Sequence, residues 1–241
     1  MKYALVTGST KGIGKEIVIK LLKENYKVIV NYSSDDEAFN LLCEEMSEFN
    51  ENIYGIKLSL DSYENSIKFC DRVKKITDNI DVLVLNCGII DKTEFGNINK
   101  EEWEKSMNIN LNCPFYIIEN LRNIINDGSG RIILMSSVMG KYAHSTSLSY
   151  NVSKAGVIAL SNGLVKYFAE RCITVNCICP GFIETPYHKN RSKESFDRIN
   201  NKIALHRFGK PEEVANLCLE IINNQYINGS TFDINGGYNY F

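Results

Sequence analysis

The 241-residue chain has no apolar run approaching the ~18 residues that a membrane-spanning helix requires. It has no long block of lysines and arginines, and its formal net charge is -2, which argues against a nucleic-acid surface or a polybasic membrane anchor. Met1 is followed almost at once by the strand-like run Tyr3–Val6 instead of a signal peptide. We therefore expect a cytoplasmic protein that binds neither nucleic acid nor membranes, with small neutral or anionic substrates left open.

The cysteines never stand in the C-x-x-C spacing of a zinc or redox site. The eight of them are scattered through expected helices and strands: Cys43, Cys70, Cys87, Cys113, Cys172, Cys177, Cys179 and Cys218. Free cysteine is among the most buried residue types, so we expect inert buried thiols and no metal site. With 44% hydrophobic residues, a chain of this length can bury a full core without disulfides or metals.

Short β-branched apolar runs alternate with amphipathic stretches, which is typical of a parallel sheet covered by helices on both faces. We expect strands at Tyr3–Val6, Val28–Tyr32, Ile53–Leu58, Val82–Leu85, Ile132–Met135, Thr174–Ile178 and Thr231–Ile234. We expect helices at Ile13–Glu24, Asp35–Phe49, Tyr63–Thr77, Lys100–Ile125, Tyr150–Glu170 and Pro211–Ile222. The sequence predicts a single doubly wound, Rossmann-type α/β domain, 1–241, with a seven-stranded parallel sheet.

Two stretches depart from this regular pattern. Pro114 lies inside the long expected helix Lys100–Ile125, where it removes a backbone donor and clashes with the preceding turn, so we expect a kink or break near Asn110–Asn112. From Phe182 to Leu205 the periodicity weakens and polar residues dominate. Because long connections in compact domains are often lids or binding loops, we expect residues 182–205 to form one or two short helices over the site.

The stretch Ser136–Lys154 places a hydroxyl, a phenol and an amine where they can converge. Ser137 follows an expected strand, and ligands bind at the carboxyl edge of open α/β sheets. Tyr150 and Lys154 are four residues apart, so on a helix they share one face. A free tyrosine has a pKa of about 10, and a nearby ammonium favours its ionised form, which makes Tyr150 a candidate acid/base. The same pair also fits an ordinary amphipathic helix.

A glycine-rich turn, Thr7–Gly14, lies between the first expected strand and helix, with the spacing Gly-x3-Gly-x-Gly. Glycines there let the backbone approach a pyrophosphate, and the helix N-terminus supplies N–H donors. Two further turns, Asn86–Gly88 and Pro180–Gly181, follow strands that end at the same edge. Each turn could be a plain loop, but three of them together indicate a nucleotide site.

These residues together resemble the short-chain dehydrogenase/reductase family along nearly the whole chain. The matching motifs are TGSTKGIG at 7–14, NCG at 86–88, Asn110, Ser137, YNVSK at 150–154, PGFIET at 180–185 and NGG at 235–237. Within the family the chain looks most like the 3-oxoacyl-acyl-carrier-protein reductases of fatty acid biosynthesis. That resemblance implies an NADPH-dependent reductase of a 3-oxoacyl thioester. The alternatives are a reductase or dehydrogenase of a free small ketone, sugar or sterol, and a non-catalytic cofactor-sensing protein.

The resemblance also implies roles for individual residues. Tyr150 would donate the proton, Ser137 would stabilise the carbonyl oxygen, Lys154 would lower the Tyr150 pKa and hold the nicotinamide ribose, and Asn110 would anchor a water. The expected cofactor-binding residues are Gly8, Ser9, Thr10, Lys11, Gly12, Ile13, Gly14, Asn31, Tyr32, Ser33, Ser59, Leu60, Asn86, Cys87, Gly88, Tyr150, Lys154, Pro180, Gly181, Ile183 and Thr185. The candidate substrate residues are Val138, Met139, Tyr142, His144, Phe182, Glu184 and Tyr187.

We expect NADP(H) to be preferred over NAD(H). The second strand has no acid at its end before Asp35, so the group that usually repels a 2′-phosphate is missing. Lys11 resembles the basic residue that NADP-dependent relatives place in the turn, and Asn31, Ser33 and Ser34 can add donors. Asp35 and Asp36 would weaken the preference if they turned inward.

The chain departs from the family pattern at a few positions. Cys87 replaces the usual alanine, and Ser59 replaces an acid that many relatives carry near the adenine. Of two basic positions that dock an acyl carrier protein, Arg171 matches but the other is Gly128. The resemblance also implies a homotetramer, paired through the expected helices Lys100–Ile125 and Tyr150–Glu170, whose surplus apolar residues are Phe115, Tyr116, Ile117, Leu164, Val165, Tyr167 and Phe168.

Overall fold

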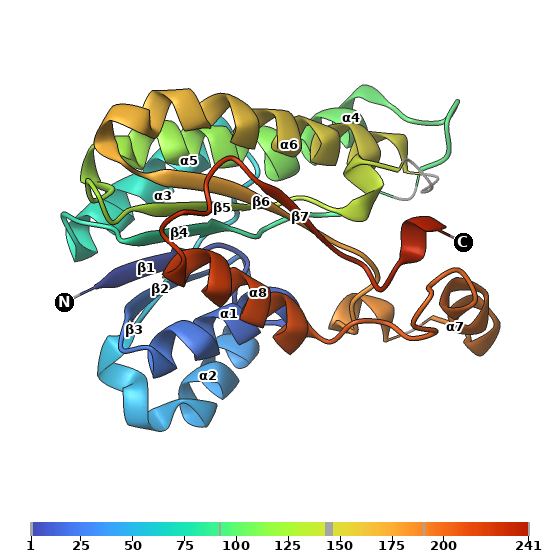
Figure 1. The fold of residues 1–241 in the computed structure, drawn as a ribbon, viewed down its shortest axis with the longest axis horizontal. Coiled ribbons are helices and arrows are strands. Elements are labelled where there is room, and N and C mark those ends of the chain that lie inside the picture. The colour runs from blue at the N-terminus through green and yellow to red at the C-terminus, as the bar shows by residue number, and fades with distance from the viewer. Residues whose placement is uncertain (1, 92, 143–146, 190, 241) are drawn as a thin grey trace.

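The computed structural model describes residues 2–91, 93–142, 147–189 and 191–240 (Figure 1). Its sheet contains β1 (Tyr3–Val6), β2 (Lys27–Tyr32), β3 (Ile53–Lys57), β4 (Val82–Leu85), β5 (Arg131–Met135), β6 (Thr174–Pro180) and β7 (Thr231–Ile234). The strand order is β3-β2-β1-β4-β5-β6-β7, and every neighbouring pair is parallel. The predicted seven-stranded, doubly wound parallel sheet is therefore confirmed.

Helices cover the sheet in two layers. The α-helices of the described chain are α1 (Gly12–Lys23), α2 (Asp36–Glu45), α3 (Tyr63–Ile76), α4 (Lys100–Met107), α5 (Cys113–Leu121), α6 (Leu148–Phe168), α7 (Lys193–Asn200) and α8 (Pro211–Asn223). In Figure 1, α1, α2 and α8 lie below the sheet, and α3, α4, α5 and α6 lie above it. Every residue of β5 and β6 is buried, as expected for strands with helices on both faces. Two large apolar clusters, one per face, make the core.

The chain reverses direction across the sheet between β1 and β4. From β1 it proceeds outward through β2 to β3, and it then returns to β4 and proceeds to β7 on the other side. Val6 at the end of β1 pairs with Val84 near the end of β4, so the loops that follow these strands emerge next to each other. In open α/β sheets, ligands bind in the crevice at such a reversal, outside the carboxyl ends of the strands.

The expected helix Lys100–Ile125 is interrupted where the sequence predicted a kink. A π-helical segment, Asn108–Asn112, separates α4 from α5, and the Cys113 N–H bonds to the carbonyl of Asn108, five residues earlier. Pro114 explains the wider turn, because its ring has no N–H and crowds the preceding carbonyls. The expected helix Asp35–Phe49 also ends early, at Glu45, and the chain continues in a 3₁₀ segment.

The segment between β6 and α8 contains a 3₁₀ turn, Pro186–His188, and the short helix α7. It packs on a third, small apolar cluster formed by Val138, Met139, Ile199, Ile203, Phe208 and Tyr238. Figure 1 shows α7 beyond the edge of the sheet, beside the C-terminal turn. This arrangement places the polar segment over the carboxyl edge of β5 and β6.

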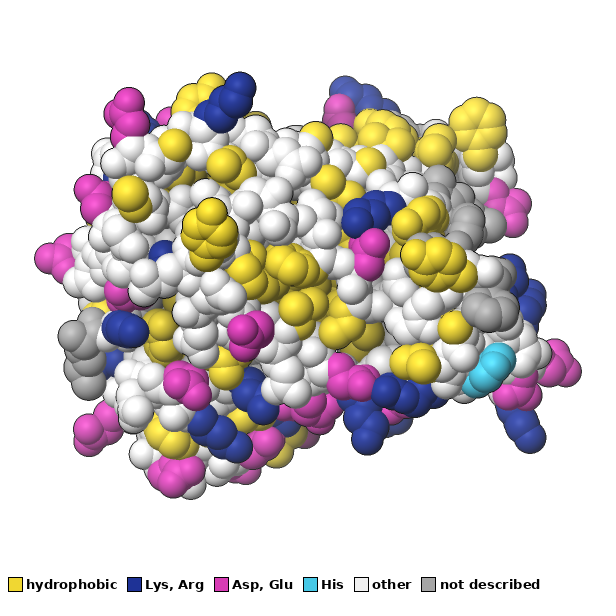
Figure 2. Space-filling model, viewed as in Figure 1, with side chains coloured by type: hydrophobic (Ala, Val, Ile, Leu, Met, Phe, Trp, Pro, Cys, Tyr) yellow, Lys and Arg dark blue, Asp and Glu magenta, His cyan; other side chains and the backbone are white. Residues whose placement is uncertain are grey.

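Charged side chains of both signs are mixed over the face seen in Figure 2, where hydrophobic atoms gather near the middle. This distribution agrees with the small net charge and gives that face no continuous basic stripe. Across the described parts of the chain, none of the helices combines the length and the apolar character needed to cross a bilayer.

Candidate active site

The glycine turn wraps closely around the start of α1. Gly8 and Gly12 have φ values of 59° and 53°, which favour glycine, and a Cβ on Gly14 would lie 2.4 Å from the Gly8 carbonyl oxygen. Lys11, at the N-cap of α1, makes no side-chain capping bond. The first N–H groups of α1 therefore keep the donors and the partial positive charge that suit a phosphate. This cradle fits the pyrophosphate of a dinucleotide.

Asn31 supports the glycine turn from β2. Its amide nitrogen donates to the carbonyls of Ile56 (3.2 Å) and Leu58 (2.9 Å), and its oxygen accepts from the Gly8 N–H at 3.3 Å. Both amide hydrogens are thus used inside the protein, where the residue is 2% exposed. We correct the expectation that Asn31 donates to a 2′-phosphate, because its role is to position the turn.

Asn86 joins the end of β4 to the same turn. Its amide nitrogen donates to the carbonyls of Thr7 (3.1 Å) and Gly8 (2.9 Å). In return, the Thr7 hydroxyl accepts from the backbone N–H groups of Asn86 (3.0 Å) and Cys87 (3.1 Å). The Cys87 side chain lies beside this contact between the end of β4 and the glycine turn, and burial raises the pKa of its thiol. The thiol therefore stays protonated and adds no charge beside the turn.

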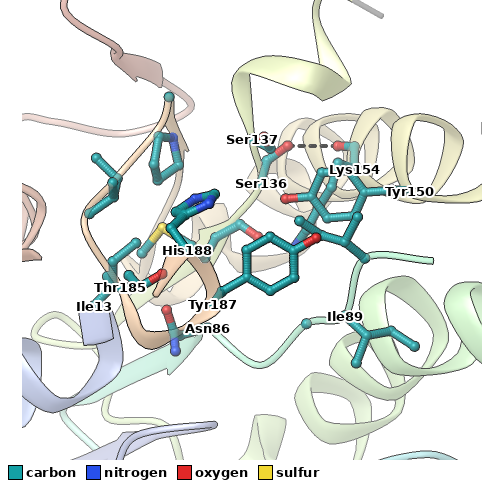
Figure 3. A pocket seen from close by; sticks show the side chains of 16 residues that line it. Ile13, Asn86, Ile89, Ser136, Ser137, Tyr150, Lys154, Thr185, Tyr187 and His188 are labelled. Atoms are coloured by element: carbon teal, nitrogen blue, oxygen red, sulfur yellow. Dashed lines mark hydrogen bonds between the residues drawn. The ribbon is translucent and has the colours of Figure 1, made fainter. Parts of the chain in front are cut away.

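Ser137 is placed by the contact between the end of β5 and α6. The Ser136 N–H bonds to the Ile178 carbonyl at 2.8 Å, and its hydroxyl donates to the Lys154 carbonyl at 2.7 Å (Figure 3). Gly140 lets the following 3₁₀ turn lie directly on α6, because a Cβ there would be 2.7 Å from the Lys154 carbonyl carbon. The Ser137 side chain is thereby held against the face of α6 that carries Tyr150.

Tyr150 and Lys154 lie on that face one turn apart, near the N-terminus of α6. Burial raises the pKa of the Tyr150 phenol above its ordinary value, while the Ser137 hydrogen bond lowers it. The direction is opposite to the lowered Tyr150 pKa that the resemblance implied. The Lys154 ammonium is 5.9 Å from the centroid of the ring and donates to the Met135 carbonyl at 2.8 Å.

Lys154 itself is 4% exposed, and burial lowers its pKa to about 8. Its ammonium form therefore still predominates at neutral pH. Asn110, from the π segment, lies beside it: a Cβ on Gly88 would be 3.1 Å from Lys154 Nζ and 3.2 Å from Asn110 Oδ1. The Asn110 side-chain oxygen accepts from the Ile89 N–H at 2.8 Å. Its amide nitrogen donates to the Ile89 carbonyl at 2.9 Å and to the Ser153 hydroxyl at 3.0 Å. Asn110 thus joins the loop after β4 to α6.

A cavity of about 430 Å³ opens at this sheet edge (Figure 3). It is lined by these residues from the predicted sets: Ile13, Asn86, Gly88, Ser137, Tyr150, Lys154, Pro180, Gly181, Ile183, Thr185 and Tyr187. Figure 3 shows Tyr187 and His188 reaching in opposite Ser137 and Tyr150. The three glycine turns, the serine and the Tyr-Lys pair therefore meet in one place.

Other predicted cofactor residues lie around this cavity. Thr10, Lys11 and Gly12 line a neighbouring hollow of about 370 Å³ together with Glu184. Ser9 donates its hydroxyl to the Val6 carbonyl, and Leu60 is buried. The Tyr32 ring stacks on Phe39 with centroids 4.9 Å apart. The Ser59 hydroxyl hydrogen-bonds the Asp61 carboxylate, which lowers the pKa of Asp61. An acid is therefore present two residues after the position where many relatives carry one.

A second cavity of about 400 Å³ shares Ser137, Tyr150, Gly181 and Tyr187 with the first. It contains the predicted substrate residues Val138, Met139 and Phe182. Tyr142 packs on the small apolar cluster below it, and His144 lies outside the described residues. The sequence did not single out Ile90, His188, Arg191, Arg198, Ile199, Lys202 and Tyr238, which also line this cavity. The only sequence signal for the cations was their place in the polar segment 182–205.

His188, one of the residues that sequence reasoning missed, stays neutral. Burial, and then the charge of Arg191, lower its pKa to about 4. At neutral pH it therefore contributes hydrogen bonding and shape to both cavities, without a charge.

Two predicted cations are already engaged by acids of the chain. Lys11 makes an ion pair with Asp35, and this contact lowers the pKa of the Asp35 carboxyl. Arg171 pairs with Asp127 at 2.6 Å and also donates to the Arg122 carbonyl. Asp35, which was expected to weaken the preference for NADP(H) if it turned inward, thus pairs with Lys11, and the Arg171 guanidinium is bonded within its own chain.

Comparison with known proteins agrees with the family resemblance of these motifs. The model of the family described as short chain dehydrogenase matches residues 2–195. The chain belongs to this family. It is therefore an oxidoreductase whose family uses a nicotinamide cofactor.

Two similar relatives are 3-oxoacyl-[acyl-carrier-protein] reductases. The 3-oxoacyl-[acyl-carrier-protein] reductase FabG of Aquifex aeolicus is 36% identical over 241 residues, which cover 98% of this chain and 96% of the relative. The enzyme of the same description from Staphylococcus aureus strain Mu50 is 32% identical, with 98% and 97% covered. A solved short chain dehydrogenase from Burkholderia cenocepacia J2315, in complex with NADP, superposes with a TM-score of 0.92 at 25% identity, covering 99% of this chain and 98% of that one.

Proposed function

We propose that this protein is an NADPH-dependent carbonyl reductase that converts a 3-oxoacyl thioester into the 3-hydroxy product. The observation that carries the proposal is the convergence of Ser137, Tyr150 and Lys154 in one cavity with the glycine turns. A sensor that only bound a nucleotide would have no need of a positioned hydroxyl, phenol and ammonium. The thioester class rests on the similarity to 3-oxoacyl-[acyl-carrier-protein] reductases.

In the proposed reaction, Ser137 and Tyr150 hydrogen-bond the carbonyl oxygen of the substrate. When bound, the nicotinamide cofactor supplies the hydride that reaches the carbonyl carbon. Tyr150 then gives its proton to the developing alkoxide, and its raised pKa keeps that proton available at neutral pH. The Lys154 ammonium stabilises the phenolate left on Tyr150 and is placed to hold the nicotinamide ribose. A proton from solvent restores Tyr150.

Asn110 acts as a positioning residue in this proposal. Its amide fixes the loop after β4 through Ile89 and fixes α6 through Ser153. The resemblance suggests that the opened backbone at this segment also anchors a water that links Lys154 to solvent. The π segment at Asn108–Asn112 supports this, because wider turns leave carbonyls less completely paired.

We propose NADP(H) as the preferred cofactor, with a modest margin over NAD(H). Lys11, at the N-cap of α1, is 53% exposed, so it can reach a 2′-phosphate. Asp35 shares that cation and reduces the benefit. Similar structures in complex with NADP and NADPH support the choice.

We also propose that residues 182–205 act as a lid and that the molecule, a single domain, assembles as a tetramer through α5 and α6. On these helices Phe115 and Tyr167 are 43% and 83% exposed, as a contact surface would require, whereas Ile117 and Phe168 belong to the subunit's own core. Light scattering at micromolar concentration should give four times the mass of one chain. A monomer mass would refute the assembly and leave the reductase untouched.

Initial rates of NADPH oxidation test the function. The panel contains acetoacetyl thioesters, an aliphatic diketone, a ketosteroid and a keto-sugar, with product analysis for each. We expect the acetoacetyl thioesters to have the highest kcat/KM. If the free ketones are reduced faster, the substrate class is wrong and the reductase assignment stands. If no ketone is reduced with NADPH or NADH, and no alcohol is oxidised in reverse, the assignment itself fails.

A further inference from the structure

Three cations from the polar segment line the second cavity together with the groups proposed to perform the reaction. Arg191, Arg198 and Lys202 share its wall with Ser137 and Tyr150. The cavity volume is about 400 Å³, which is in the size range of small-molecule sites. A ketone held by Ser137 and Tyr150 would therefore share this cavity with three positive side chains.

These cations are not neutralised by the described part of the chain. Its ion pairs involve none of the three, and no carboxylate is among the residues that line the cavity. Nearby cations behave differently: Arg207 pairs with Glu213 at 2.7 Å and Lys141 with Asp233 at 2.8 Å. His188 stays neutral because its pKa is about 4, so the charge of the wall comes from Arg191, Arg198 and Lys202.

The local structure holds these side chains near one another. Ile199 is 8% exposed and packs into the small apolar cluster, which anchors α7 and leaves the adjacent Arg198 exposed. The Lys202 N–H bonds to the Ile199 carbonyl at 2.8 Å, so Lys202 follows one turn after Arg198. Like charges four residues apart destabilise a helix end slightly, so the protein gains no stability from placing Lys202 next to Arg198.

Arg191 is oriented more firmly than the other two. Its guanidinium donates to the Ser195 hydroxyl at 2.8 Å and to His188 Nδ1 at 3.4 Å, and it lies 6.0 Å from the centroid of the Phe182 ring. One face of the group is thus held against an aromatic side chain of the cavity. The N–H groups of this oriented guanidinium that Ser195 and His188 do not use can donate to an oxyanion.

We propose that Arg191, Arg198 and Lys202 form an anion subsite, and that the preferred substrate is a ketone that carries a carboxylate or a phosphate. The inference rests on the proposed reductase function and narrows its substrate class. A cavity wall with several unpaired cations raises the local concentration of anionic substrates and disfavours cationic ones. The anionic oxygens can come from the phosphate of a phosphopantetheine thioester or from the carboxylate of a free keto acid.

Two matched substrate pairs test the proposal and separate these sources. The first pair is acetoacetyl-pantetheine and its 4′-phosphorylated form, and the second is levulinate and its methyl ester. In NADPH-dependent reduction by the wild type, we expect the anionic member of at least one pair to have about tenfold higher kcat/KM. The pair that shows the preference identifies the source. The preference should shrink as salt is raised, because Arg198 and Lys202 are exposed to solvent.

Variants then locate the preference. We expect the anionic-to-neutral ratio to fall toward unity in Arg198→Gln/Lys202→Gln and in Arg191→Gln. Lys193→Gln is the matched control, because it removes a charge from α7 at an exposed position that does not line the cavity. Its ratio should equal that of the wild type. Equal rates within both pairs, or a preference that persists undiminished in both variants, would overturn the subsite.

Calorimetric titration of the four compounds into Tyr150→Phe, with NADP⁺ present, separates this inference from the reductase assignment. Tighter binding of the anionic compounds without any turnover by the wild type would overturn the reductase and leave the subsite standing. Turnover without discrimination by charge would overturn the subsite and leave the reductase standing. The absence of both binding and turnover would overturn both.

Discussion

The two ends of the active-site cavity are built differently. Ser137 and Lys154 are 7% and 4% exposed, and backbone contacts from β5, β6 and α6 hold their surroundings. Arg198 and Lys202 are exposed and stand on a short helix anchored by a small apolar cluster. We propose that the rigid end performs a reaction common to the family, and that the lightly anchored end selects the ketone that enters.

Replacing Tyr150 with phenylalanine should have the largest effect. The substitution removes the transferable proton and keeps the ring, so kcat should fall at least about a hundredfold while the Kd for NADPH changes little. Steady-state rates and a fluorescence titration of NADPH measure the two quantities. Retention of more than about a tenth of the wild-type rate on every active substrate would show that the rigid end does not supply the proton.

Gly140→Ala should disturb the same end through packing alone. The added methyl would lie 2.7 Å from the Lys154 carbonyl carbon, so the turn that follows Ser137 must move away from α6. We expect a cost of about 1–3 kcal/mol in unfolding free energy and about a tenfold loss of kcat. Gly163→Ala in α6 is the control, since its Cβ would meet nothing within 4 Å. Equal melting temperatures and rates for the two variants would contradict the packing argument.

The pH dependence of reduction should follow the protonation state of the Lys154 side chain. Because burial lowers its pKa to about 8, the ammonium is present below that pH and is lost as the pH rises through it. The Tyr150 pKa is raised, so its proton remains over this range. We expect kcat/KM to be flat in the neutral range and to fall by about tenfold per unit well above pH 8. The residual activity of Lys154→Arg should lack this fall; a wild-type profile level to pH 10 would refute the role of the ammonium.

The smallest expected effect concerns the cofactor. Lys11→Ala should lower the ratio of kcat/KM for NADPH over NADH by about three- to tenfold, and Asp35→Asn should raise it by a similar factor. The asparagine can still cap α2, because Asp35 accepts from the Ala38 N–H at 2.9 Å, so only the charge changes. A wild type that prefers NADH, or a ratio that neither variant moves, would show that this pair does not select the cofactor.

The sequence predicted the rigid end well because its signals are local. Strand runs, glycine turns and the spacing of Tyr150 and Lys154 depend on near neighbours, and the structure brings them together. The clustering of Arg191 with Arg198 and Lys202 depends on how Ile199 packs on a distant cluster, which no local pattern encodes. The same limit explains the corrections: the buried bonds of Asn31 and the raised Tyr150 pKa arise from contacts distant in sequence.

The most direct test of the reductase assignment is to follow the hydrogen atoms. Acetoacetyl-phosphopantetheine is reduced with NADPH that carries deuterium at the transferable position, and the product is examined by mass spectrometry. For the wild type we predict one deuterium at the carbon that bore the ketone, and for Tyr150→Phe we predict the same label at a rate at least about a hundredfold lower. An unlabelled product, or labelled product formed at equal rates by both proteins, would contradict the account.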